Sequence, residues 1–330
     1  AEQAVRETDA GMLADPVGKK LLACLEPFSA KKKIAPDDNL ELDLGLDSLA
    51  RVELVVSIEK SFGVSLPESF GSEVFTVKDA VMKIKGLLAA GPAEAGGHVR
   101  LSWGEILSLD PAEEAKDTVR LGFGPLCQAG RYLLRLALSV TVRAYGRLSV
   151  TGVGNLPPKG PYIMAPNHLS LADAPAVMAA LPWRTASQVF SLGATGYFGG
   201  PVMSRLSKFI NVIPVDMDSR LHNALQLSAY VLRRGKVLLV FPEGGRSRDG
   251  SLKEFKKGVG IIARELNIPI IPVVLRGTDA MLAPGMRFPR PAKISVSFGK
   301  PVYPEGRDYE GIVQALYGEV VKMLEAKQAR

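Results

Sequence analysis

The chain has 330 residues, of which 47% are hydrophobic and 23% charged, a composition that excludes disordered and fibrous proteins and a length that favours two or more domains. Its formal net charge is +7, but residues 1–90 hold 11 Lys and Arg against 15 Asp and Glu, whereas residues 91–330 hold 30 against 19. The basic part favours an anionic partner, such as a lipid surface, a phosphorylated substrate or the acidic part of the chain itself. Because the sequence contains no recognisable nucleic-acid-binding module, we do not expect a nucleic acid as partner.

Residues 12–90 predict a small all-helical domain. Apolar residues repeat at helical spacing over residues 17–28, and a second periodic segment opens at Ser48, a residue type suited to a helix N-cap. Gly63 ends that segment, and a last helix is expected over residues 77–88. Taken by itself, Ser48 is explained as a helix cap, so any further role has to be inferred from the residues around it.

Residues 91–123 predict a linker. Glycine, alanine and proline are common in its first part, a composition typical of a flexible segment. Ser102 and Glu105 have the spacing of a capping box, and Asp110 followed by Pro111 is typical of a second helix start. We therefore expect two short helices between the domains.

Residues 121–145 form the most apolar long segment of the chain. Arg131, Arg135 and Arg143 interrupt it, so it lacks the ~20 consecutive apolar residues that a membrane-spanning helix needs. Two interpretations stay open: an amphipathic helix lying at a membrane surface, or a helix packed on its own domain. Both can hold on different faces of one helix.

From residue 124 to residue 330 the pattern indicates an α/β domain. Apolar strand-like runs alternate with helical segments, which is typical of a parallel or mixed sheet flanked by helices. The fold class is therefore multidomain: an all-α bundle followed by an α/β domain with an amphipathic helical segment at its start. The expected strands are residues 162–165, 209–215, 236–241, 270–275 and 294–298, and the expected helices include residues 220–234 and 259–266.

The clearest candidate chemistry lies in the segment N-H-L-S-L-A-D at residues 167–173. A neutral imidazole can take a proton from an alcohol, and a carboxylate on its other ring nitrogen fixes the tautomer and stabilises the imidazolium. Asp173 can reach His168 if the segment is a loop running into a helix. Without further context, however, a His-x4-Asp pair is common and also describes an ordinary surface pair.

A second candidate segment, F-P-E-G-G-R-S at residues 241–247, follows an apolar run, so its turn projects from a strand end, where α/β proteins keep their sites. Arg246 offers planar, bidentate recognition of a phosphate, and Gly244 allows close approach of the backbone. Lys256 adds positive charge or is an ordinary solvated lysine. This context favours the catalytic interpretation of His168 over the surface pair.

The first domain resembles acyl carrier proteins over residues 12–90. The resemblance rests on D-L-G-L-D-S-L at residues 43–49, V-E-L at 52–54 and I-E-K-S-F-G-V-S-L-P at 58–67. It implies a four-helix bundle whose Ser48 carries covalent 4′-phosphopantetheine, attached by a phosphopantetheinyl transferase, with an acyl group held on the thiol as a thioester. The acidic residues around Ser48 suit docking to a basic partner surface.

The second domain resembles the glycerophospholipid acyltransferase family over residues 145–300. The first, third and fourth motifs of the family correspond to residues 167–173, 241–247 and 270–273. The resemblance implies that His168 is the catalytic base and that Asp173 is its partner. It also implies that the third motif binds the acceptor, through Glu243, Gly244, Arg246 and Ser247.

Two positions depart from the family pattern. The family usually has Thr where this chain has Gly245, and its second motif usually carries an Arg where this chain has Met217. Arg220, one turn further on, is a candidate substitute, and Lys208 together with Arg246 is another. The identity of the acceptor is therefore the least determined property of the predicted site.

Together these patterns predict an O-acyltransferase that moves an acyl group from a phosphopantetheine thioester, on its own or another carrier, to the hydroxyl of a lysophosphatidate or lysophospholipid. His168 is the general base, and no metal is expected, because backbone amides can stabilise the oxyanion. One alternative keeps this chemistry with an acyl-CoA donor or another alcohol acceptor. A second alternative is a non-catalytic carrier and membrane-recruitment module, which the missing Arg of the second motif keeps open.

Cys24 and Cys127 lie in different predicted domains and lack metal-ligand spacing, which favours free thiols in a reducing compartment. No signal peptide is recognisable, so we expect a peripheral protein on the cytoplasmic face of a membrane. Carrier and acyltransferase fusions resemble the tails of larger acyl-activating proteins, and the chain begins at Ala1 without Met. An adenylate-forming domain ahead of Ala1 is therefore one further expectation.

Overall fold

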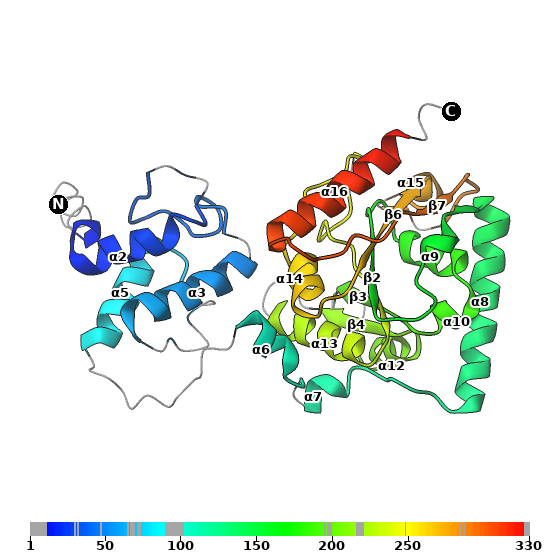
Figure 1. Cartoon of the computed structure of the whole chain (residues 1–330), viewed down its shortest axis with the longest axis horizontal. Coiled ribbons are helices and arrows are strands. Elements are labelled where there is room, and N and C mark those ends of the chain that lie inside the picture. The colour runs from blue at the N-terminus through cyan, green and yellow to red at the C-terminus, as the bar shows by residue number, and fades with distance from the viewer. Residues whose placement is uncertain are drawn as a thin grey trace. The chain divides into compact units, whose positions relative to one another are not determined.

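The structure is a computed structural model that describes residues 12–29, 31, 33–46, 48–64, 66, 70, 74–89, 102–111, 113–194, 196, 200–215, 221–247, 249–283, 285–286 and 288–326. The chain divides into two compact units, with the main division between residues 101 and 102 (Figure 1). The glycine-rich part of the predicted linker lies outside the described residues. The domain boundaries given above therefore stay a prediction.

The first unit is helical, with helices α2 (Pro16–Leu25), α3 (Ser48–Phe62) and α5 (Val77–Ala89). α2 begins one residue before the predicted helix, because Asp15 accepts the Gly18 backbone N–H at 2.7 Å and proline occupies the first turn. α3 ends before Gly63, whose φ of 69° is left-handed and so cannot continue the helix.

The three helices bury a shared apolar core built from positions that repeat at helical spacing. Leu21, Leu54 and Ile84, one from each helix, are at most 2% exposed. The helical nature of the first domain is confirmed. Most residues between 65 and 73, where a fourth helix of the predicted bundle would lie, are outside the described residues, so the count of four stays a prediction.

The described residues of the second unit contain a seven-stranded mixed sheet, which confirms the predicted class. In sheet order the strands are β1, β7, β6, β2, β5, β3 and β4, and every neighbouring pair is parallel except β6 with β7. Met164, Leu239 and Ile271 align on one face and are buried there. The bounds are β1 (Ser149–Thr151), β2 (Tyr162–Pro166), β3 (Val189–Ala194), β4 (Val212–Val215), β5 (Val237–Leu239), β6 (Ile270–Arg276) and β7 (Ser295–Phe298).

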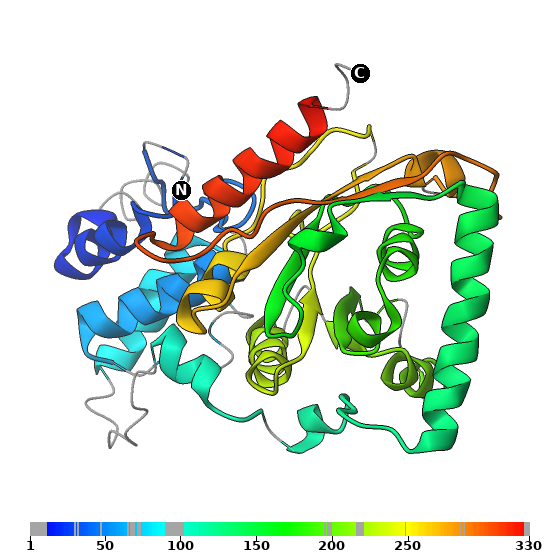
Figure 2. The same cartoon turned by 45° about the vertical axis from the view of Figure 1, so that its right-hand side comes forward.

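Helices surround this sheet (Figure 2). Their bounds are α6 (Trp103–Ser108), α7 (Glu113–Lys116), α8 (Pro125–Gly146), α9 (Asp173–Ala180), α10 (Trp183–Ala186), α12 (Pro201–Phe209), α13 (Leu221–Arg233), α14 (Gly258–Glu265), α15 (Thr278–Met281) and α16 (Tyr309–Glu325), with a 3-10 turn η1 (Val153–Asn155). α8 packs against α9, α14 packs against α16, α16 lies against β6 and α12 lies against β4. The central strands β2, β5 and β6 are thus buried, whereas the edge strand β1 is largely exposed.

Some predicted bounds need correction. The strand expected over residues 209–215 is shorter, because Phe209 ends α12 and Asn211 turns the chain with a left-handed φ of 59° before β4 begins. The sequence did not indicate β1 and β3. β1 has only three residues, and β3 reads V-F-S-L-G-A without regular alternation, so neither shows the period of two that marks a strand.

The two helices expected before the second domain are present, and the first starts as predicted. Ser102 and Glu105 form the capping box at the start of α6. The start of the second differs, because the Asp110 carboxylate accepts from Arg233 Nη2 at 2.9 Å and α7 begins at Glu113. Asp110 therefore joins this segment to α13.

α8 covers the apolar segment predicted to be a helix. On its inner side Val142 is buried in the apolar core, and Arg135 Nη2 donates to the Met178 carbonyl of α9 at 3.1 Å. Its outer side is apolar, with Leu126, Leu133 and Val140 exposed by 88%, 63% and 57%. None of the described helices is both long and apolar enough to span a membrane. α8 therefore packs on its own domain with one face and presents an apolar face outward.

Candidate active site

The candidate residues meet where β2 and β5, which are neighbouring parallel strands, end. Asn167 follows β2; its side-chain oxygen accepts the Leu275 N–H at 2.7 Å, and its side-chain nitrogen donates to the Leu275 carbonyl at 3.1 Å. This two-point contact ties the end of β2 to β6 and holds the next residue, His168, at the edge of the sheet. Sites of α/β proteins lie at this edge.

His168 and Asp173 form a hydrogen-bonded pair. Nδ1 of the imidazole lies 2.8 Å from Asp173 Oδ2, and Asp173, the first residue of α9, is fully buried. The same oxygen accepts the backbone N–H groups of Leu169 at 2.6 Å and Ser170 at 2.8 Å. Because a carboxylate accepts hydrogen bonds and does not donate them, Nδ1 carries the ring proton and Nε2 is left as the basic nitrogen.

The ring of Phe241 holds the imidazole of His168 in place. The two ring centroids are 3.9 Å apart and the ring planes differ by 22°. The His168 side chain is 19% exposed, and no described residue hydrogen-bonds to its Nε2. One basic nitrogen is therefore left open, as proton abstraction from an alcohol requires.

Glu243 lies behind the backbone of His168. Its Oε1 accepts the His168 backbone N–H at 2.7 Å, and its Oε2 accepts the Lys253 backbone N–H at 3.1 Å. The side chain is 5% exposed, and burial raises the pKa of this carboxyl group. The family resemblance implied an acceptor-binding wall here, but both oxygens are bonded to the protein's own backbone.

The turn after Glu243 carries the other residues of the third motif. Gly244 has a φ of 69°, a left-handed conformation that favours glycine, and is exposed. Ser247 is 3% exposed and its hydroxyl donates to Asp249 Oδ1 at 2.8 Å, so its side chain is occupied. The Arg246 carbonyl accepts from Lys253 Nζ at 2.8 Å, and the Lys256 N–H donates to the Pro242 carbonyl at 2.8 Å. The two predicted cations therefore lie on one hydrogen-bonded loop.

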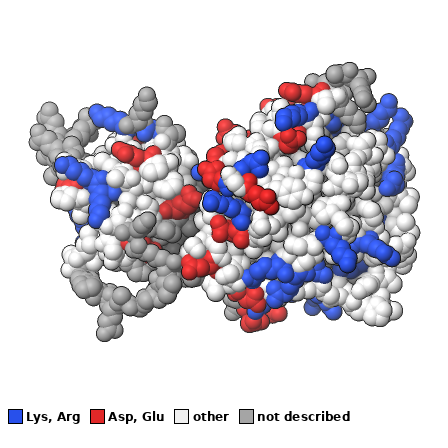
Figure 3. Space-filling view, in the orientation of Figure 1, with Lys and Arg blue, Asp and Glu red and all other residues white. Residues whose placement is uncertain are grey.

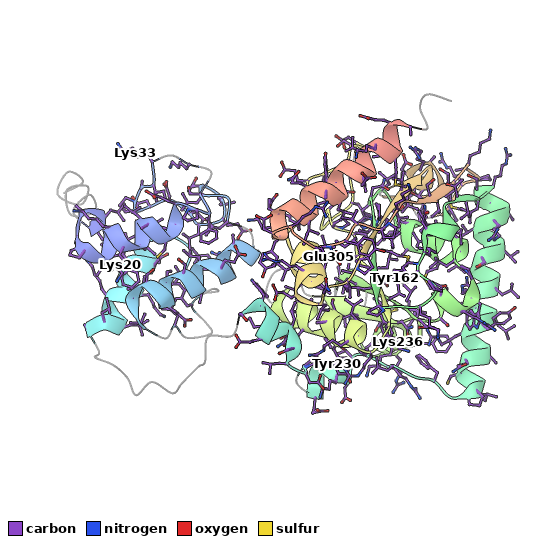
Figure 4. The ribbon with its side chains drawn as sticks, viewed as in Figure 1. Lys20, Lys33, Tyr162, Tyr230, Lys236 and Glu305 are labelled. Carbon is purple, nitrogen blue, oxygen red and sulfur yellow. The ribbon has the colours of Figure 1, made fainter. Side chains whose placement is uncertain are left out.

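Tyr162, which Figure 4 labels, is a buried titratable group at the first position of β2, whereas His168 follows the other end of that strand. Its hydroxyl has no hydrogen-bond partner among the described residues. Burial raises the pKa of Tyr162 to about 12, so the phenol is neutral near pH 7 and does not exchange protons with the site.

Lys and Arg lie at several separate places on the visible face of the second unit, in keeping with the scattered cations of the sequence (Figure 3).

Comparison with known families matches both halves of the chain. The family described as Acyltransferase matches residues 147–276, the range that contains the His168–Asp173 pair and Glu243. The family described as Phosphopantetheine attachment site matches residues 21–72, the range that contains Ser48. The chain carries a phosphopantetheine-attachment domain and an acyltransferase domain. The geometry at the ends of β2 and β5 belongs to the acyltransferase domain.

The acyltransferase domain is similar to 1-acyl-sn-glycerol-3-phosphate acyltransferases. A chloroplastic protein of that name from Brassica napus is 28% identical over 52% of this chain and 50% of its own length, and the alpha form from Mus musculus is 29% identical over 53% and 61%. The crystal structure of the 1-acyl-sn-glycerophosphate acyltransferase PlsC from Thermotoga maritima has a TM-score of 0.50 at 25% identity, covering 61% of this chain and 83% of that one. The chain spans about half the length of the curated relatives it matches.

Of the other predicted residues, only Lys208 can be compared with this site, and it lies away from it. Lys208 lies in the last turn of α12 beside β4, and β4 is three strands from β2, about 14 Å at ~4.8 Å per strand. Arg220 and Met217 lie outside the described residues. Ser48 is the first residue of α3 in the phosphopantetheine-attachment domain, and its side chain is not described. The roles predicted for Lys208, Arg220 and Ser48 therefore stay predictions.

A largely apolar cavity adjoins the candidate site, and no sequence pattern indicated it. Its volume is about 180 Å³, and it lies between α8, α9, α10, α12 and the sheet. Ala174, directly after Asp173, lines one part, and Leu134, Met178, Val189 and Leu239 line others. These residues come from separate segments, so only the folded chain brings them together.

Proposed function

We propose that the chain transfers an acyl group from a phosphopantetheine thioester, on its own or another carrier domain, to the hydroxyl of a lysophosphatidate or lysophospholipid. The observation that carries this proposal is the His168–Asp173 pair, at 2.8 Å, with Nε2 left open at the strand ends of an acyltransferase domain. A phosphopantetheine-attachment domain in the same chain supports a carrier thioester as the donor.

In the proposed reaction, His168 Nε2 takes the proton of the acceptor hydroxyl as its oxygen attacks the carbonyl carbon of the thioester. The buried Asp173 carboxylate stabilises the imidazolium that forms. The backbone N–H of Gly245 is the candidate for stabilising the oxyanion, because the neighbouring Gly244 N–H already donates to the Phe241 carbonyl at 3.1 Å. When the carbon–sulfur bond breaks, the imidazolium returns its proton to the departing sulfur, so charge and protons balance.

Ser48 is the proposed attachment point of 4′-phosphopantetheine, whose thiol holds the acyl group as a thioester. The backbone fits this role, because Ser48 is the first residue of α3, a 15-residue helix. A phosphodiester at that position is favoured by the positive end of the helix. Attachment requires a phosphopantetheinyl transferase as a partner.

The cavity beside α9 is the proposed site of the acyl chain. It begins at Ala174, next to the partner of the catalytic base, and its lining is mainly aliphatic. Burying an alkyl chain there is favourable by ~0.8 kcal/mol for each methylene group removed from water. In this proposal the thioester lies at the Ala174 side of the cavity, because Ala174 directly follows Asp173.

The direct test of this function is to load Ser48 with an acyl-phosphopantetheine, using a phosphopantetheinyl transferase and acyl-CoA, and to add lysophosphatidate or lysophospholipids in vesicles. Intact protein mass and the lipid products are followed over time. We expect the acyl mass to leave the protein and to appear on one class of lysolipid. A loaded chain that keeps its acyl group with every lysolipid offered would contradict the proposal.

The apolar outer face of α8 is the proposed contact with a membrane surface, on the cytoplasmic side. Leu133→Asp together with Val140→Asp should weaken binding to anionic vesicles by tenfold or more, because burying one such side chain in an apolar layer is worth ~1.5–3 kcal/mol and ~1.4 kcal/mol is tenfold. Both side chains are more than half exposed, so folding should be kept. Vesicle co-sedimentation measures the effect.

The matched control for α8 is Leu42→Asp in the phosphopantetheine-attachment domain, where the leucine is 85% exposed. This change introduces one of the two negative charges of the α8 variant at an equally open apolar position of the other unit. It should leave vesicle binding unchanged. Equal vesicle binding by the α8 double variant and the wild type would remove α8 as the membrane contact.

A further inference from the structure

Almost every polar atom of His168 is hydrogen-bonded, and most of the partners of this residue lie in one short segment of the chain. Its backbone N–H donates to Glu243 Oε1 at 2.7 Å, and its carbonyl accepts the Ser247 N–H at 2.8 Å. Its ring lies on Phe241, and its Nδ1 contacts Asp173 at 2.8 Å. Three of these four partners lie between residues 241 and 247, so the position of the base depends on how that segment is anchored.

The Glu243 carboxylate provides that anchor through two different backbone groups. One oxygen accepts the N–H of His168 and the other accepts the N–H of Lys253, while the side chain is only 5% exposed. Lys253 also reaches back with its Nζ to the Arg246 carbonyl at 2.8 Å. A single buried carboxylate thus connects the loop of the base to the loop that carries Arg246.

We propose that Glu243 is a positioning residue that sets the place of His168 relative to the Arg246 loop, and that it does not bind the acceptor. With both oxygens bonded to backbone N–H groups and almost no exposed surface, the carboxylate has little capacity left for a substrate. A misplacement of about 1 Å in a catalytic group can cost on the order of 100-fold in rate, so this anchor should matter for turnover.

Burial raises the pKa of Glu243, which means that folding disfavours the ionised carboxylate although two N–H groups hold it. A glutamine of the same length would avoid the buried charge. It has only one accepting oxygen, however, and its NH2 group would face an N–H donor. Glu243→Gln therefore keeps at most one of the two bonds, and Glu243→Asp is too short to reach both backbone groups.

The inference rests on the proposed acyl transfer for its kinetic test. For Glu243→Gln and Glu243→Asp we expect kcat to fall by tenfold or more while KM for the lysolipid changes by less than about threefold. The control is Glu265→Gln, which alters a carboxylate that accepts from Tyr309 in the same domain and should leave kcat unchanged. A large rise in KM for the acceptor with kcat retained would overturn the proposal and return Glu243 to the acceptor site.

A second readout does not depend on activity. Amide hydrogen exchange at His168 and Lys253 should become at least tenfold faster in both Glu243 variants, relative to amides in β6, because each loses an N–H acceptor. If the wild type transfers no acyl group to any lysolipid, the proposed function fails, but the exchange rates still decide whether Glu243 anchors the backbone of His168. Unchanged exchange at both amides would overturn the anchoring role. Using two variants guards against a single substitution that fails to fold.

Discussion

Replacing His168 by alanine should slow discharge of the loaded carrier onto a lysolipid by ~10²–10⁴-fold, the usual contribution of a positioned general base. The imidazole is the group whose Nε2 is open at the strand ends, and alanine leaves nothing there to take the hydroxyl proton. Folding should be retained, because Asp173 keeps its bonds to two backbone N–H groups. Single-turnover loss of the acyl mass from the intact protein measures the rate.

The matched control for that experiment is His222→Ala, which removes an imidazole elsewhere in the same domain and should leave the rate as it is. Loading of Ser48 has to be equal in all proteins before acceptor is added. An unchanged rate in His168→Ala would exclude the general-base role and favour the non-catalytic alternative for the acyltransferase domain. Acyl loss only to water, with no lipid product, would point to another acceptor.

Replacing Ser48 by alanine should abolish loading and with it all transfer from the chain's own arm, because the phosphodiester forms on the serine hydroxyl. The expected mass increase of the arm should be absent from this variant, and lysolipid should stay unacylated. Ser57→Ala, in the same helix, is the control that should load normally. Mass spectrometry after treatment with the transferase decides the point, and loading of Ser48→Ala would place the attachment elsewhere.

Mixing the two variants separates transfer within a chain from transfer between chains. His168→Ala supplies a loaded arm without a base, and Ser48→Ala supplies a base without an arm. A tether can give an effective concentration on the order of mM, so transfer within one chain should greatly exceed exchange between chains at micromolar protein. Recovery of the full wild-type rate in the mixture would show that the arm serves other molecules equally well.

Much of the site could be predicted because its residues are close along the chain. Asp173 lies five positions after His168, and a loop that runs into a helix brings them together through local turns alone. The same holds for the start of α3 at Ser48, where a cap residue precedes an apolar repeat. The helical first domain and the mixed sheet were also predictable, since the helical period of 3.6 and the short apolar runs of buried strands appear directly in the residue order.

The contacts of Glu243 could not be predicted in this way. It lies 75 residues from His168, and only the pairing of β2 with β5 brings its carboxylate to the His168 N–H. Motif resemblance placed this residue at the acceptor, whereas burial decides that both oxygens bond to backbone. Lys208 shows the converse, because a basic residue near the second motif ends up beside β4, three strands from β2.

The sequence by itself determined the two domain types, the His168–Asp173 pair and the residue types of the Phe241 turn, because these depend on short-range spacing and local propensity. Tertiary structure alone decided the cavity behind α9, the anchoring position of Glu243 and which face of α8 is turned outward. These properties depend on contacts between segments that are far apart in the chain. Strand order and burial bring those segments together, and the residue pattern of a single segment does not show either of them.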